Sequence, residues 1–124
     1  MLSLLLTGVV HAVPLDEAVA AYDAGNYVQA GQMLYTHAEN GNPEAQFRLG
    51  SLHSLGQGTP VNHEVAALWF EKAAERGHHE ATVTLANMYL SGLGLPRDEA
   101  AALAWFERAA TIAEEQEIEE EECD

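Results

Sequence analysis

The sequence predicts an all-α protein built from antiparallel helix pairs, and two observations support this prediction. Apolar residues make up 48% of the 124-residue chain; alanine dominates this share and β-branched residues are few, which favours closely packed helices over strands. In addition, Trp-Phe-Glu, a basic residue and Ala-Ala occur twice, starting at Trp69 and at Trp105. Because one active site needs one set of groups, this duplication indicates repeated architecture.

The duplicated motif belongs to a longer internal repeat. Trp69 and Trp105 are 36 positions apart, and at this offset 11 of the 30 aligned positions from 45 to 74 are identical. A period between about 20 and 50 residues is typical of solenoids, in which each unit packs on its neighbours. We therefore expect one folded unit with four parts: a degenerate capping hairpin at 13–41, full repeats at 42–77 and 78–113, and an acidic tail at 114–124.

Each full repeat predicts two helices joined by a turn. The first helix carries an apolar stripe at helical spacing, which consists of Ala45, Leu49, Leu52 and His53 in one copy and Ala81, Leu85, Met88 and Tyr89 in the other. Glycines and a proline then end this helix. Asn62 and Asp98 stand at matching positions where they can cap the second helix. We expect that helix to bury Trp69 and Trp105 at equivalent positions.

The capping hairpin has the same organisation in a shorter form. Helices are predicted near 15–24 and 27–40, with a tight turn at Gly25-Asn26-Tyr27 between them. At the other end of the chain, the acidic tail contains 8 of the 20 acidic residues. For this tail we expect solvated disorder or a frayed extension of the last helix.

The N-terminal segment MLSLLLTGVVHA, residues 1–12, is similar to the end of a secretory leader. It has an apolar run and small residues at the two positions that a signal peptidase reads, but it lacks a basic start. The run is also too short to span a bilayer, which takes about 20 residues. We expect a cleaved leader and a periplasmic or secreted protein. The alternative is a structural segment packed on the next helix, in a cytoplasmic protein.

The charge distribution excludes nucleic acid as a partner. The net charge is −15, and the five basic residues are scattered along the chain: Arg48, Lys72, Arg76, Arg97 and Arg108. Nucleic-acid binding needs a basic face that displaces counterions from phosphates.

The single cysteine, Cys123, cannot form an internal disulfide, so we interpret it as a free thiol that can link two chains.

No pattern in the chain predicts a catalytic, metal or cofactor site. The Gly-x-Gly turns at 56–58 and 92–94 lack the preceding strand and the following Lys-Ser or Lys-Thr of a phosphate loop. Of the six histidines only His78 and His79 are neighbours, and adjacent side chains point apart. We therefore expect no enzyme, no cofactor and no metal.

The repeat resembles the Sel-1-like repeat, a relative of the tetratricopeptide repeat. The resemblance rests on Ala-x-x-x-Leu-Gly-x-x-His-x-x-Gly-x-Gly from Ala45 and on Ala-x-x-Trp-Phe-x-x-Ala-Ala-x-x-Gly from Ala66. His53 departs from the tyrosine that the family prefers, which Tyr89 supplies in the second copy. Ala113 replaces the closing glycine. The resemblance implies a short right-handed α/α superhelix, and it covers roughly residues 15 to 113.

The resemblance also implies a non-catalytic scaffold that holds a peptide or helix of a partner protein in the solenoid groove. We expect positions opposite the apolar stripe to face this groove: Glu44, Phe47, Ser51, Ser54, Glu80, Val83, Asn87 and Leu90. The negative field favours a basic or amphipathic partner. Alternatives are that Phe47, Val83 and Leu90 pack on the capping helix near Tyr22 and Val19, or that the surface mediates self-association. A β-lactam-handling relative is a weaker alternative, because the paired cysteines of such relatives are absent.

Overall fold

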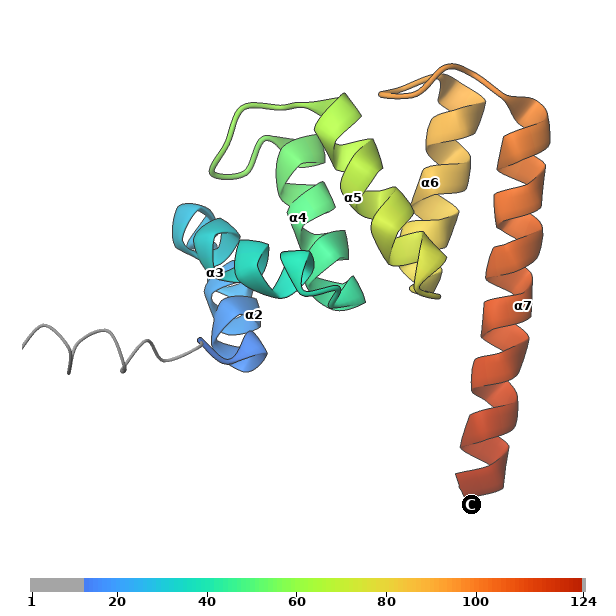
Figure 1. Cartoon of the computed structure of the whole chain (residues 1–124), viewed down its shortest axis with the longest axis horizontal. Helices are drawn as coiled ribbons and strands as arrows, with labels where there is room; N and C mark the ends of the chain where they lie inside the picture. The colour runs from blue at the N-terminus through green and yellow to red at the C-terminus, as the bar shows by residue number, and fades with distance from the viewer. Residues whose placement is uncertain (1–12, 124) are drawn as a thin grey trace, which may run out of the picture.

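The computed structural model describes residues 13–123, and all regular structure in this part of the chain is helical. The helices are α2 (Leu15–Asp23), α3 (Tyr27–Glu39), α4 (Pro43–Leu55), α5 (His63–Glu75), α6 (His79–Ser91) and α7 (Glu99–Cys123). Each helix packs against the next along the chain, so that three hairpins stack side by side (Figure 1). The predicted all-α repeat solenoid is confirmed. The predicted leader at residues 1–12 lies outside the described residues.

Side-chain caps begin the second helices where the sequence predicts them. The side chain of Asn62 accepts a hydrogen bond from the Val65 amide at 3.0 Å, and that of Asp98 accepts one from the Ala101 amide at 3.0 Å. Each cap satisfies one of the amide groups that a helix start leaves unpaired. Both predicted caps are therefore confirmed.

The loops after α4 and α6 approach the preceding hairpin at a glycine. A Cβ atom on Gly58 would lie 2.8 Å from the backbone of Tyr27 and Val28, and one on Gly94 would lie 2.2 Å from the carbonyl oxygen of His63. Both glycines have positive φ, 75° and 78°. Because His63 follows Tyr27 by 36 positions, the same contact recurs in each repeat and sets how closely the hairpins stack.

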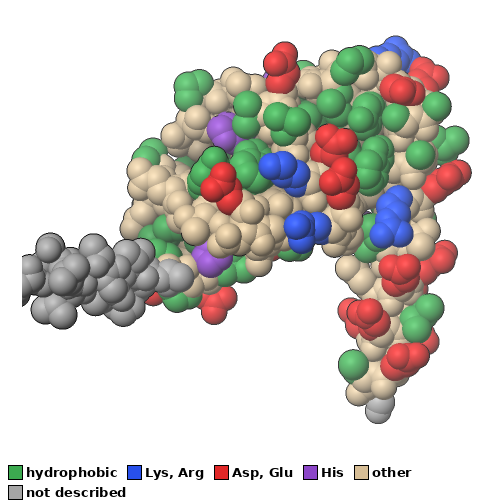
Figure 2. Space-filling model, in the orientation of Figure 1, with side chains coloured by type: hydrophobic (Ala, Val, Ile, Leu, Met, Phe, Trp, Pro, Cys, Tyr) green, Lys and Arg blue, Asp and Glu red, His purple; other side chains and the backbone are tan. Residues whose placement is uncertain are grey.

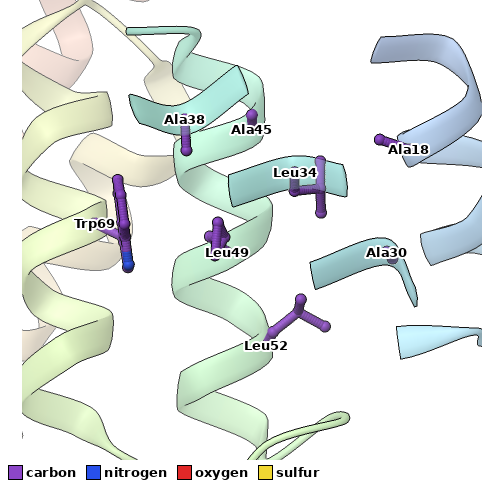
Figure 3. Close-up of a cluster of buried hydrophobic side chains, with 8 residues drawn as sticks. All are labelled: Ala18, Ala30, Leu34, Ala38, Ala45, Leu49, Leu52 and Trp69. Carbon is purple, nitrogen blue, oxygen red and sulfur yellow. The ribbon is translucent and has the colours of Figure 1, made fainter. Parts of the chain in front are cut away.

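Two apolar clusters form the core, one at each junction between hairpins. The first cluster joins α2, α3, α4 and α5: Ala18, Ala30, Leu34, Ala38, Ala45, Leu49, Leu52 and Trp69 (Figure 3). The second joins α5 and α6: Ala66, Ala67, Phe70, Ala73, Ala74, Ala81, Leu85 and Met88. Small alanines alternate with large side chains in both clusters, as close helix packing requires.

The two tryptophans are not equally buried, so that expectation was wrong. Trp69 is 9% exposed, and its ring meets Tyr35 of α3 edge-on with ring centroids 5.9 Å apart. Trp105 is only partly buried against the second cluster. At the offset of 36 residues, the position of Tyr35 is occupied by Glu71. A carboxylate supplies no aromatic cover, which explains the greater exposure of Trp105.

The last helix continues through the acidic run instead of ending with the second repeat. Residues 114–123 are all exposed, and they extend α7 beyond the other helices (Figure 1). Acidic side chains gather on this projection in the space-filling view (Figure 2). Within residues 13–123, no helix combines the length and apolarity that crossing a membrane requires.

Candidate interaction surface

The eight residues predicted to face a groove lie on α4 and α6, and we call them the inner surface. Glu80, Asn87 and Leu90 are exposed, with Leu90 at 43%. The other five are half-buried: Glu44, Phe47, Ser51, Ser54 and Val83. The apolar stripes of the same helices are buried, except for His53 and Tyr89, which are half-buried. The inner surface is therefore more exposed than the stripe, although only part of it is open to a partner.

Phe47, which the sequence predicts to face the groove, has aromatic partners inside the fold. Its ring packs against Phe70 of α5 with centroids 5.7 Å apart, and it stacks on the ring of His78 at 4.6 Å. It belongs to the rim of the second cluster. Phe47 thus stabilises the junction between α4, α5 and the start of α6, which the helical period of α4 alone did not indicate.

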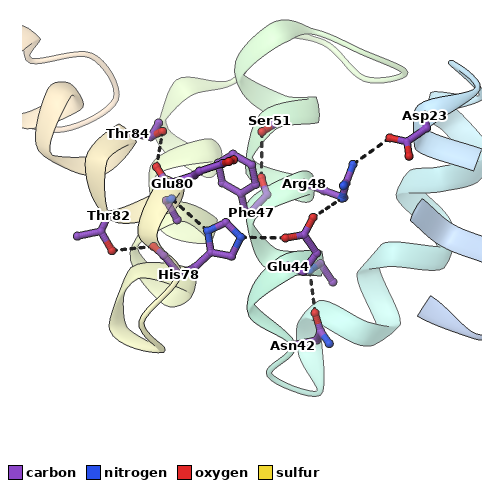
Figure 4. Close-up of polar contacts among 12 residues, drawn as sticks. Asp23, Asn42, Glu44, Phe47, Arg48, Ser51, His78, Glu80, Thr82 and Thr84 are labelled. Atoms are coloured by element: carbon purple, nitrogen blue, oxygen red, sulfur yellow. Dashed lines mark hydrogen bonds and ion pairs between the residues drawn. The ribbon is translucent and has the colours of Figure 1, made fainter. Parts of the chain in front are cut away.

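A chain of polar contacts crosses from α2 through α4 to α6. Arg48 on α4 lies 3.2 Å from the Asp23 carboxylate at the end of α2, and it also pairs with Glu44 one turn away at 2.5 Å. The second oxygen of Glu44 lies 2.9 Å from Nε2 of His78, just before α6 (Figure 4). These four side chains connect one helix of each of the three hairpins.

His78 has two tasks in this network. Its Nδ1 accepts the amide hydrogen of Ala81 at 3.2 Å and so caps α6. An accepting Nδ1 places the ring proton of a neutral imidazole on Nε2, where it is donated to Glu44. A neutral histidine therefore satisfies both contacts at once.

The environment of Glu44 favours its charged form. Burial alone would raise the pKa of Glu44, but hydrogen bonds from His78 and Arg48 have the opposite effect and together lower this pKa below its ordinary value. The guanidinium of Arg48 also lies 4.8 Å from the ring centre of Tyr22, a cation–π contact on the same face. The network is thus a charged, fixed arrangement along the inner surface.

A hollow of about 470 Å³ lies at one end of this network. It is lined by Pro43, Glu44, Arg76, Gly77, His78, His79, Glu80 and Gln116. It brings Glu44 and Glu80 together from the predicted set, but none of the other six. Its lining includes two carboxylates, one guanidinium and two imidazoles, and Gln116 belongs to the α7 extension. Among residues 13–123, no three His, Cys, Asp or Glu side chains gather as metal ligands would.

Sequence reasoning missed Asp23, Arg48 and His78 as parts of this surface. The repeat offset contains a signal for one of them, because His78 follows Asn42 by 36 positions. Asn42 caps α4 through the Ala45 amide at 3.0 Å, as His78 caps α6. For Asp23 and Arg48 the contact depends on how α2 packs across α4, which the periodicity does not specify.

A family model described as Sel1 repeat matches residues 43–78 and 79–111. The two matched segments cover more than half of the chain, and each begins one residue after the start of a predicted full repeat, 42–77 or 78–113. A comparison with curated proteins finds no match.

Solved structures with the same architecture are similar to this chain. A Sel1 repeat protein from Oxalobacter formigenes is 34% identical with a TM-score of 0.75, over 79% of this chain and 40% of that one. The protective antigen c5321 of uropathogenic Escherichia coli, which displays an SLR fold, is 31% identical with a TM-score of 0.74, over 87% and 25%. Cysteine-rich protein B of Helicobacter pylori is 21% identical with a TM-score of 0.66, over 68% and 63%, which shows the fold alone. The chain spans less than half of the first two structures.

Proposed function

Because the chain belongs to the Sel1 repeat family, whose members generally serve as protein-interaction scaffolds, we propose that it is a non-catalytic adaptor. Its inner surface binds a peptide or a short helix of a partner protein. The observation that carries this proposal is the polar chain from Asp23 to His78, which fixes α2, α4 and α6 relative to one another. A surface that is already ordered loses less conformational entropy when a partner binds.

The proposed partner segment is basic and amphipathic. The exposed members of the inner surface are one acidic, one amide and one apolar side chain, Glu80, Asn87 and Leu90. A partner segment complements them when it carries an apolar residue that contacts Leu90 and a lysine or arginine that pairs with Glu80. The net charge of −15 and the acidic extension of α7 add a long-range field that attracts such a segment.

A matched pair of variants tests this proposal by capture from an extract of the native host. The inner-surface variant is Glu80→Lys/Leu90→Ala. The control is Leu103→Ala/Glu107→Lys on α7, which changes the charge equally and also truncates an exposed leucine. We expect specific partners to be recovered with the wild type and the control and lost with the inner-surface variant. Equal recovery with all three proteins contradicts the proposed surface.

The rival proposal is self-association through the same surface. Light scattering over a range of concentrations separates the two. A dimer of the wild type and the control that the Glu80→Lys/Leu90→Ala variant loses favours self-association over an adaptor role.

We also propose that the protein acts in the bacterial periplasm or outside the cell after cleavage near Val13. The apolar segment MLSLLLTGVVHA motivates this proposal. Fractionation of the native host followed by intact mass measurement tests it. An exported form that begins near Val13 supports export, whereas an intracellular form that retains Met1 supports the cytoplasmic alternative.

A further inference from the structure

A second surface feature lies on the other side of α4, outside the inner surface. A groove of about 590 Å³ runs between α3, α4 and the loop after α4, lined by Tyr27, Val28, Gly31, Gln32, Tyr35, Leu49, Leu52, His53, Gln57, Gly58 and Thr59. None of these residues belongs to the inner surface. Leu49 and Leu52 form the floor, and Leu52 points from α4 toward α3 (Figure 3). At the rim, Val28 and Tyr35 are 62% and 48% exposed, so the groove is open along one side.

A hollow also lies at the corresponding position of the next repeat, but no residue of α6 lines it. It is lined by Glu64, Leu68, Gly92, Gly94, Leu95 and Pro96. Its lining matches Val28, Gln32, Gly58 and Thr59 at the offset of 36 residues, but it includes no counterpart of the floor residues Leu49 and Leu52. The internal repeat therefore provides two versions of the same site: an open version whose lining includes Leu49 and Leu52, and a closed version of about 530 Å³ whose lining includes no counterpart of them.

Three lining positions carry a smaller residue in the open version. Gly31, His53 and Thr59 correspond to Ala67, Tyr89 and Leu95 in the next repeat. Tyr89 and Leu95 pack against the second apolar cluster. In the closed version, a tyrosine ring and an aliphatic side chain thus lie against this cluster. In the open version, smaller residues stand at these positions, and the floor residues Leu49 and Leu52 line the groove with 4% and 3% of their surface exposed.

The groove combines an apolar floor with a polar end. Within the described residues its lining carries no acidic or basic side chain apart from His53, and burial lowers the pKa of this imidazole, which favours its neutral form. The side chain of Gln57 has a buried Oε1 with no hydrogen-bond partner among the described residues. An unpaired buried acceptor destabilises the free protein, and a donor that reaches it restores the missing hydrogen bond.

We propose that this groove receives a tyrosine side chain from an extended segment of a partner protein. The ring packs on Leu49 and Leu52 between the aromatic walls of Tyr27 and Tyr35, where edge-to-face contacts are favourable. The hydroxyl group reaches the polar end and donates to Gln57. The partner thereby supplies the aromatic ring that Tyr89 supplies within the next repeat. The open rim fits a side chain carried on a peptide rather than an enclosed small ligand.

A second copy of the chain is a poor source of this tyrosine. Among the described residues, Tyr35 is the one aromatic side chain in the group of exposed large hydrophobics. It already forms a wall of the groove. The lining has no Asp, Glu, Lys or Arg side chain, which also distinguishes this partner from the basic segment proposed for the inner surface.

A selection with a random dodecapeptide library tests this proposal on the full chain. The groove-filled variant is Gly31→Ala/His53→Tyr/Thr59→Leu, in which each residue becomes its counterpart in the next repeat. We expect selected peptides to be enriched in tyrosine and to bind the groove-filled variant at least about tenfold more weakly. Selection of no peptide, peptides without enriched tyrosine, or equal affinity for the groove-filled variant overturns the proposal.

Two further variants keep the test decisive. Gly31→Ala alone is expected to fold, because the added Cβ would lie at an ordinary contact distance of 3.4 Å from Cδ1 of Leu52, and it should still weaken binding. Replacing the tyrosine of the peptide by phenylalanine should cost a few-fold to about tenfold in affinity with the wild type and nothing with Gln57→Leu. An unchanged preference for tyrosine in Gln57→Leu contradicts the proposed hydrogen bond. The Glu80→Lys/Leu90→Ala variant should bind these peptides normally, so the two surfaces are tested independently.

Discussion

Nε2 of His78 lies 2.9 Å from Oε2 of Glu44, while Nδ1 of the same ring accepts the Ala81 amide hydrogen. One side chain therefore begins α6 and also ties α6 to α4. The stacking of Phe47 on this imidazole, with ring centres 4.6 Å apart, encloses the contact from one side. The boundary between the two full repeats is thus held by both polar and aromatic contacts.

Replacing His78 should separate these two tasks. His78→Asn retains a capping side chain, as Asn42 does for α4, but loses the contact with Glu44. We expect His78→Ala to lower the free energy of unfolding by about 1 to 2 kcal/mol, through the lost cap and the lost hydrogen bond. His78→Asn should cost less. Urea denaturation followed by circular dichroism measures both variants, and equal losses for the two would contradict the capping role.

The lowered pKa of Glu44 makes part of the stability depend on pH. Because the folded-state pKa lies below the value of about 4.5 in the unfolded chain, the carboxylate stabilises the fold fully above that value. This contribution is lost as the pH falls through the lower folded-state pKa. The difference in Tm between the wild type and Glu44→Gln should thus be largest near about pH 7 and shrink toward about pH 3.

Comparison of these two proteins is essential to that measurement, because the chain has 19 other acidic residues whose protonation can also change Tm on the acidic side. These residues are the same in both chains, so their effect cancels in the difference. A difference in Tm that is constant over this range of pH contradicts the favourable environment assigned to the Glu44 carboxylate.

The unequal burial of the tryptophans predicts unequal costs of truncation. Trp69→Ala should lower the free energy of unfolding by about 3 to 5 kcal/mol, as expected for a large aromatic side chain removed from a core. Trp105→Ala should cost about 1 to 3 kcal/mol. Chemical denaturation of both variants, compared at equal m-values, tests whether Trp69→Ala loses more free energy of unfolding than Trp105→Ala. A larger loss for Trp105→Ala than for Trp69→Ala would contradict the described packing.

The acidic extension should contribute helix but little stability. All residues from 114 to 123 are exposed, whereas Ile112 is buried at 3% exposure. A chain that ends at Ala113 should lose helical ellipticity in proportion to the residues removed. Its free energy of unfolding, measured by denaturation followed by tryptophan fluorescence, should change by less than about 0.5 kcal/mol. A large loss of stability would show that the extension supports the repeats.

The sequence predicted the features that recur every 36 residues, because each is set by local chemistry. The capping residues Asn62 and Asp98 and the buried stripe through Leu49 and Leu85 are examples, since each follows from residue type and helical period. The features that sequence reasoning missed depend on which neighbouring element lies opposite. Phe47 meets His78 across a repeat boundary, and a pattern within one helix does not report such a contact.

The exposure of Trp105 and the open groove have the same explanation. Each arises where one copy of the repeat lacks a side chain that the other copy has. Glu71 replaces Tyr35 beside Trp105, and Gly31 replaces Ala67 beside the groove. The differences are visible in the aligned repeats, but their consequences appear only when the hairpins are stacked.

The most direct test of the adaptor function is the dissociation constant of a captured native partner, measured with the wild type, Glu80→Lys/Leu90→Ala and Leu103→Ala/Glu107→Lys at low and high salt. The adaptor account predicts that the inner-surface variant binds at least about tenfold more weakly. It also predicts that the α7 control binds as the wild type does, and that salt weakens wild-type binding by screening the acidic field. Equal dissociation constants for all three proteins would contradict it.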